Sequence, residues 1–260
     1  MIDYMVSYFK SFFQNPSGLG ILLAISIGLA IAFGAVWLAG YRPPLFKKPW
    51  LWAVLVSSAF LTLAAVCFIQ IPLDKWIRPL LSPRQILAAG ITLVLLTGLV
   101  QEGAKLVPVV VYWWRSGKNI DPKLGLAIGA VAGAGFGILE AQWAHNLIFA
   151  TGWTWAAVQT YGFVALLGFW ERFFTVAVHI AFSALAGYGL AKGWGWQFYL
   201  IASMLHGLLN YGAVLRQAGL LTTFQVEIYI AVVAVLVTAW ALWLRWRKRV
   251  TTADPATSSL

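Results

Sequence analysis

The stretch LVQEGAKLVPVV, residues 99–110, places a glutamate and a lysine inside an apolar run that extends from about residue 86 to residue 114. Glu102 and Lys105 are three positions apart, so on a helix they share one face. Charged side chains are costly within a membrane, so they face the interior of a helix bundle and mark functional sites. The stretch therefore predicts a polar centre inside a membrane-spanning bundle.

The composition of the whole chain indicates the same class. Of its 260 residues, 61% are hydrophobic and 10% are charged, whereas a soluble domain carries about 25% charged residues. The net charge of +10 does not indicate nucleic-acid binding, because the basic residues follow the ends of apolar runs. The single cysteine, Cys67, excludes an intrachain disulfide and a zinc site built from cysteines.

Seven segments are long and apolar enough to cross a bilayer, which takes about 20 residues as a helix. They are residues 18–39, 50–70, 86–114, 124–150, 168–191, 196–214 and 225–244. We therefore predict an all-α, polytopic transmembrane helix bundle of about seven spanning helices with a polar intramembrane cavity. Residues 153–167 are either an aromatic interfacial helix or the start of an eighth element.

These segments predict how the chain is organised. We expect an interfacial amphipathic segment at 1–17, two transmembrane helices in 18–85, a four-helix catalytic-type core in 86–214, a C-terminal transmembrane helix in 215–250 and a disordered tail at 251–260. Most Lys and Arg residues then fall on the side of the C-terminus. That distribution predicts an integral membrane protein with its N-terminus outside and its C-terminus in the cytoplasm. We expect the membrane to be a prokaryotic plasma membrane.

One spacing pattern predicts how the helices pack. Gly125, Gly129, Gly133 and Gly137 recur every four residues, which makes a flat groove along one helix face. A neighbouring backbone can approach such a groove closely. Helix packing alone accounts for the pattern, and it indicates that the helix at 124–150 is central.

The ionisable and amide residues within the spans are few, and most lie in four consecutive spans. The candidates for a site are Glu102 and Lys105, Glu140, Arg172 and His179, and His206 and Asn210. A rise of about 1.5 Å per residue puts the two carboxylates and the two imidazoles at a similar depth. Each residue taken alone can be a structural ion pair or a hydrogen-bonded imidazole; convergence across four helices favours a hydrolytic or metal-binding centre.

The order of these motifs resembles a known family. QEGAK (101–105), FGILE (136–140), RFFTVAVHIAFS (172–183) and HGLLN (206–210) are similar to the motifs of PrsW/YhfC-type intramembrane proteases. That family belongs to the superfamily of CAAX prenyl proteases and bacteriocin-immunity proteins (CPBP). The similarity covers about residues 86–214. Two positions depart from the family pattern: Gln101 replaces the first of two glutamates, and Ala141 replaces an asparagine.

The resemblance implies hydrolysis of a peptide bond in or near the bilayer. Glu102 would then be the general base, and His179 and His206 would polarise water or bind a metal such as Zn²⁺. Glu140 would be the third metal ligand or a second acid/base. Asn210 would donate a hydrogen bond to the oxyanion, and Arg172 would hold Glu140 or the substrate carbonyl. The expected partners are membrane-protein or lipid-embedded peptide substrates and membrane lipids, with no nucleic acid.

Other functions remain open at this point. A metal-free Glu/His mechanism would use the same residues, and the absence of an HExxH helix excludes only the zincin arrangement. A proton-coupled transporter would also place Glu, His and Lys at mid-depth. A non-catalytic scaffold or immunity-type protein would use the glycine groove to bind other helices.

Overall fold

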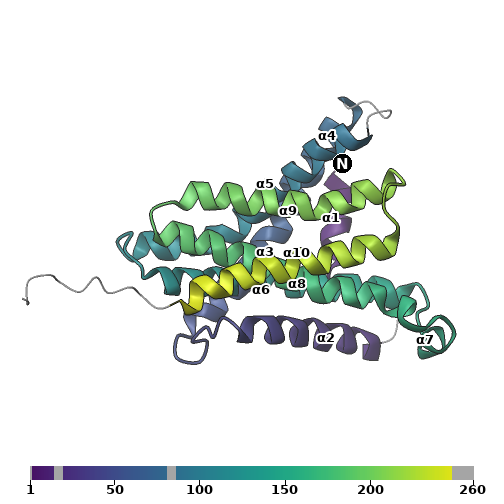
Figure 1. Cartoon of the computed structure of the whole chain (residues 1–260), viewed down its shortest axis with the longest axis horizontal. Helices are drawn as coiled ribbons and strands as arrows, with labels where there is room; N and C mark the ends of the chain where they lie inside the picture. The colour runs from purple at the N-terminus through teal and green to yellow at the C-terminus, as the bar shows by residue number, and fades with distance from the viewer. Residues whose placement is uncertain (1, 15–19, 81–85, 248–260) are drawn as a thin grey trace, which may run out of the picture.

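The computed structural model describes residues 2–14, 20–80 and 86–247, and these form an all-helical bundle with no strand among them (Figure 1). The principal helices are α1 (Ile2–Ser11), α2 (Gly20–Ala39), α3 (Trp50–Ala65), α5 (Ile86–Arg115), α6 (Pro122–Ala150), α8 (Leu167–Ala191), α9 (Gly195–Gln217) and α10 (Thr223–Trp246). Within the described residues, seven helical stretches are long and apolar enough to cross a membrane. The predicted fold class is confirmed. The predicted tail at 251–260 lies outside the described residues.

Helices α6 and α8 form the centre of the bundle. They pack on each other more extensively than any other pair, and most of their residues are buried. Helices α2 and α3 cover α6, helices α9 and α10 cover α8, and α5 lies between α3 and α9. The glycine pattern therefore predicted the central helix correctly.

Glycine allows the backbones of α6 and α8 to touch. A Cβ atom at Gly129 would overlap the carbonyl oxygen of Ser183, and one at Gly133 would overlap the carbonyl oxygen of His179. Gly187 of α8 makes the reciprocal contact with Gly125 of α6. Small residues permit this approach inside a membrane, where apolar side chains gain little by leaving lipid.

The contact between α5 and α9 likewise depends on glycines that allow the two backbones to approach closely. A Cβ atom at Gly98 would overlap the carbonyl oxygen of Ser203, and one at Gly207 would lie 3.2 Å from the carbonyl oxygen of Val94. Gly98 is one turn before Glu102, and Gly207 follows His206 directly. The close approach of the two backbones therefore brings the side chains of Glu102 and His206 together.

The second span is longer than predicted. After α3 the chain makes a π-helical turn (Val66–Gln70) and continues as α4 (Ile71–Ile77) and a 3₁₀ turn (Arg78–Leu80), where the sequence had predicted a loop from residue 71. The N–H of Ile71 bonds the carbonyl of Val66, five residues back. Pro72 accounts for this widened turn, because its ring would crowd the carbonyl of Phe68 in a regular α-helix. Beyond it, α4 projects obliquely from the bundle (Figure 1).

Two shorter segments lie at the edges of the bundle. Phe12, which follows α1, packs on Leu63 and Cys67 and stacks on Trp143 with ring centroids 4.8 Å apart. The position of α1 at a membrane surface stays a prediction. Residues 153–167 contain a short helix, α7 (Trp155–Tyr161), and a 3₁₀ turn (Gly162–Leu166) that leads directly into α8.

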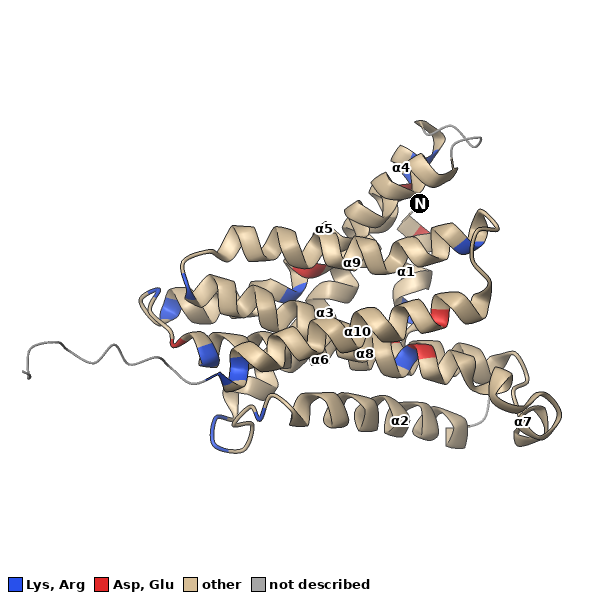
Figure 2. Ribbon diagram, viewed as in Figure 1, with Lys and Arg blue, Asp and Glu red and all other residues tan. Residues whose placement is uncertain are grey.

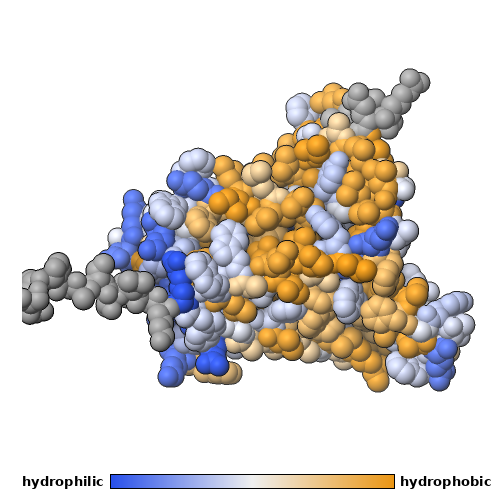
Figure 3. Space-filling model, in the orientation of Figure 1, coloured by the Kyte–Doolittle hydropathy of each residue, from blue (hydrophilic) through white to orange (hydrophobic). Residues whose placement is uncertain are grey.

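Basic and apolar residues occupy different parts of the surface along the long axis of the bundle. Lys and Arg gather at the end of the bundle where α10 ends (Figure 2). Apolar residues cover the flanks visible in Figure 3. This distribution is typical of an integral membrane protein, and the orientation of the termini across the membrane stays a prediction.

The glycine contacts generate the first testable prediction. We expect Gly133→Ala to destabilise the folded protein by about 1–3 kcal/mol, because the added methyl group must push α8 away from α6. The measurement is thermal unfolding in detergent, followed by circular dichroism. Gly28→Ala is the matched control, because no atom lies within 4 Å of a Cβ built at Gly28. Equal melting temperatures for the two variants would contradict the prediction.

Candidate functional site

The centre of the candidate site is an ion pair buried within α5. The Nζ atom of Lys105 lies 2.5 Å from Oε1 of Glu102, and the two side chains are 0% and 1% exposed. The same Nζ atom lies 3.0 Å from Nδ1 of His179 on α8. The lysine therefore connects the carboxylate of one helix to the imidazole of another.

Hydrogen-bond chemistry assigns the protons on the two imidazoles. An ammonium group only donates, so Nδ1 of His179 accepts from Lys105 and the ring hydrogen is on Nε2. A carboxylate only accepts, so Nδ1 of His206, which lies 2.6 Å from Oε1 of Glu102, carries the hydrogen on the second ring. Nε2 of a neutral His206 is then a free acceptor.

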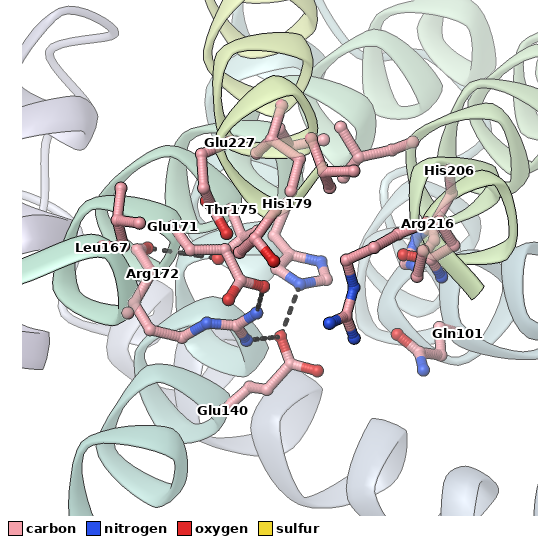
Figure 4. A pocket seen from close by; sticks show the side chains of 18 residues that line it. Gln101, Glu140, Leu167, Glu171, Arg172, Thr175, His179, His206, Arg216 and Glu227 are labelled. Carbon is pink, nitrogen blue, oxygen red and sulfur yellow. Dashed lines mark hydrogen bonds and ion pairs between the residues drawn. The ribbon is translucent and has the colours of Figure 1, made fainter. Parts of the chain in front are cut away.

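The network continues to α6 and back to α8. Nε2 of His179 donates to Oε2 of Glu140 at 3.1 Å, and Arg172 donates to the same oxygen at 3.3 Å. Arg172 also pairs with Glu171 (Figure 4). The groups thus alternate between acceptors and donors from His206 to Glu171, which compensates charges that would be unstable alone in a low-dielectric bundle.

A pocket of about 400 Å³ opens beside this network. Its lining includes Gln101, Glu140, Arg172, His179, His206, Asn210, Arg216 and Glu227. Glu102 and Lys105 are absent from the lining and lie behind the two imidazoles. A molecule in the pocket would therefore meet His206 and His179, with Glu102 supporting His206 from behind.

The structure brings together the two carboxylates and the two imidazoles that were expected to converge, as two carboxylate–imidazole pairs. Glu102 contacts His206, and Glu140 contacts His179. Asn210 lines the pocket one turn after His206 and makes no hydrogen bond to another described side chain. Arg172 holds Glu140, which is one of the two roles predicted for it.

The side chains that could hold a metal ion differ from the predicted set in their carboxylate. Donor atoms of Glu102, His179 and His206 lie within 4.8 Å of one another. Glu140 is outside this group, because it meets His179 at Nε2 while Lys105 and Glu102 lie on the Nδ1 side. Oε2 of Glu102 is buried without a hydrogen-bond partner, which suits a metal ligand. The Lys105 ammonium group bonds Oε1 of Glu102 and Nδ1 of His179, so a metal ion bound by these two atoms would have to displace it.

A comparison with protein families identifies the chain at this point. A family model described as PrsW family intramembrane metalloprotease matches residues 47–240, about three quarters of the chain. The chain belongs to this PrsW family. Searches of curated proteins and of solved structures found no match. Assignment to the YhfC branch or to the wider CPBP superfamily stays a prediction.

Sequence reasoning missed two parts of this candidate site. The π-helical turn aims Gln70 at α5, where it accepts from Gln101 and donates to Thr97, both at 3.1 Å. Gln101, which departs from the family pattern, is thus part of a hydrogen-bonded chain that joins Gln101, Gln70 and Thr97. Pro72 in an apolar run is the sequence signal that could have indicated this turn. The second missed residue is Arg216, which lines the pocket from the last turn of α9.

The buried ion pair generates the second prediction. We expect Lys105→Met to lower the free energy of unfolding by about 3–5 kcal/mol, because it leaves the Glu102 carboxylate buried without its counter-ion. Adding Glu102→Gln should restore a large part of that loss. The measurement is a double-mutant cycle of unfolding in detergent. Additive effects of the two substitutions would show that the pair is not energetically coupled.

Proposed function

We propose that this PrsW-family protein hydrolyses peptide bonds of transmembrane or juxtamembrane protein segments at a Glu/His centre. The observation that carries the proposal is the hydrogen bond between Glu102 and His206 at the wall of the pocket. A carboxylate behind an imidazole, with a free acceptor nitrogen toward a cavity, is the arrangement that activates a nucleophile in hydrolases. Family membership supports the protease class.

His206 is the group that we place against the attacking water. Its Nε2 atom takes a proton as the water oxygen bonds the scissile carbonyl carbon, and Glu102 stabilises the imidazolium through Nδ1. The sequence alone had given the proton transfer to Glu102. The burial of Glu102 behind the ring supports a positioning role instead.

The other pocket residues complete the reaction. Asn210, one turn along α9, donates its side-chain N–H to the oxygen that gains negative charge. His206 then gives its proton to the leaving amine nitrogen as the C–N bond breaks, which yields one carboxylic acid and one amine. Glu140, fixed by Arg172, keeps the His179 ring in position.

The donor set also suits a divalent cation such as Zn²⁺, which agrees with the metalloprotease description of the family. Glu102, His179 and His206 would hold it. The ion would act as a Lewis acid toward water or the substrate carbonyl. Because Lys105 bonds two of these residues, its ammonium group and the ion compete for the same donors.

The third prediction tests catalysis. Glu102→Gln should lower kcat on a set of synthetic single-span peptides in proteoliposomes by about 10²–10⁴-fold, with KM little changed, because the imidazolium loses its stabilising charge. Mass spectrometry of the products measures the rate, and circular dichroism confirms folding. Asp74→Asn is the matched control, since Asp74 pairs with Arg78 on α4 at the protein surface. Unchanged cleavage by Glu102→Gln would reject the role given to Glu102, whereas no cleavage by the wild type would favour the scaffold or transporter alternatives.

The fourth prediction concerns the metal. We expect about one equivalent of a divalent metal in the purified protein, its loss in His206→Ala, and a higher occupancy in Lys105→Met, because the competing ammonium group is then absent. Elemental analysis after dialysis against a defined zinc concentration is the measurement. Equal zinc contents in the wild type and His206→Ala would exclude His206 as a ligand, and no metal in any variant would leave the metal-free mechanism.

A further inference from the structure

Arg216 has an unusual position for a charged residue of this bundle. It lies in the last turn of α9, is exposed, and makes no hydrogen bond or ion pair with another described residue. The other described arginines that line a pocket are engaged: Arg172 by Glu140 and Glu171, Arg78 by Asp74, and Arg247 by Tyr188. A basic residue near a helix C-terminus is favoured by the helix dipole, but that preference does not explain where its side chain goes.

The side chain of Arg216 extends into the pocket. Arg216 lines the pocket from α9, and Figure 4 draws its guanidinium group among the labelled side chains of that pocket. Glu140 is held by Arg172 and His179, so it is not free to pair with Arg216. Glu227 lines the same pocket, yet no hydrogen bond joins it to Arg216. The pocket therefore contains a guanidinium group whose donors are unused.

Arg216 also lies where two pockets meet. A second pocket of about 940 Å³ runs between α4, α5 and α9, and it shares Asn210, Ala213 and Arg216 with the first. These three residues are spaced at i, i+3 and i+6, so they lie on one face of α9. The second pocket is also lined by Gln70 and Thr97, which belong to the hydrogen-bonded chain with Gln101. An extended peptide could follow this path from the second pocket to His206.

We infer that Arg216 binds a carboxylate of the substrate polypeptide, and this inference rests on the proposed proteolytic function. A guanidinium fork matches a carboxylate in a bidentate geometry, and the two hydrogen bonds are assisted by the opposite charges. The pocket already holds the carboxylates of Glu140, Glu171 and Glu227, so it favours a monoanion over a phosphate of higher charge. Because Arg216 lines the pocket, its position likewise favours a substrate in the pocket over a lipid headgroup outside it.

The spacing along α9 limits where that carboxylate lies in the substrate. Arg216 is ten residues after His206, which is about 15 Å along a helix. An extended chain advances about 3.3 Å per residue, so the carboxylate lies within about five residues of the bond that is cut. The substrate class is thus a membrane-protein segment with an acidic side chain, or a terminal carboxylate, close to the cleaved bond.

The test uses single-span synthetic peptides in which Asp, Asn or Lys occupies each position in turn, with the full-length protein in phosphatidylcholine vesicles. At the best position the wild type should cleave the Asp peptide about tenfold or more faster than the Asn peptide. Arg216→Gln should remove that preference, and Arg216→Glu should shift it toward Lys. Arg115→Gln is the matched control, because Arg115 is an exposed arginine at the end of α5, across the bundle from the pocket. Peptides ending in a carboxylate or an amide separate the two sources of the charge.

Several results would overturn the inference. A preference for Asp that persists in Arg216→Gln would do so, as would equal losses on the Asp and Asn peptides. A discrimination that appears only when phosphatidylglycerol is added to the vesicles would assign Arg216 to lipid phosphate. If no peptide is cleaved, the affinities of the Asp and Asn peptides for Glu102→Gln decide separately: retained discrimination supports the carboxylate site while the proteolytic function fails, and equal affinities reject the site.

Discussion

The ammonium group of Lys105 is the interaction on which the site depends. It neutralises Glu102 within α5 and bonds His179 of α8, while Glu102 in turn bonds His206 of α9. Three helices therefore share one buried charge centre. Such a centre is stable away from water only when every partner is in place, and so the position of each imidazole is fixed by electrostatics as well as by packing.

Distances this short require helix backbones that nearly touch. Glycine permits this close approach at two places near the candidate site. Gly133 lies against the backbone carbonyl of His179, and Gly98 lies against the backbone carbonyl of Ser203. A larger residue would separate the helices by more than the hydrogen bonds can span. These glycines, which carry no side-chain functional group, thus control the geometry of the candidate site residues.

The sequence predicted the fold and the members of the site better than their arrangement. Apolar length identified the spans, and a constant rise per residue put Glu102 and His206 at one depth. Depth does not reveal which helices are neighbours, so the pairing of Glu140 with His179 could not be derived. The helix beyond Gln70 was missed because a proline such as Pro72 normally ends a helix. Here the π-helical turn before Pro72 accommodates the proline ring, and the helix continues. Arg216 was missed because a basic residue at a helix end is the ordinary case.

The placement of the counter-ions has a consequence for how the chain enters the membrane. Glu102 and Lys105 are one turn apart on the same helix, so α5 can be inserted with its charges already paired. Glu140 of α6 has no such partner on its own helix among the described contacts, and it reaches Arg172 only when α8 is present. Association of the two central helices therefore completes the charge pairing of Glu140, and the glycine contacts between α6 and α8 form the surface through which the helices meet.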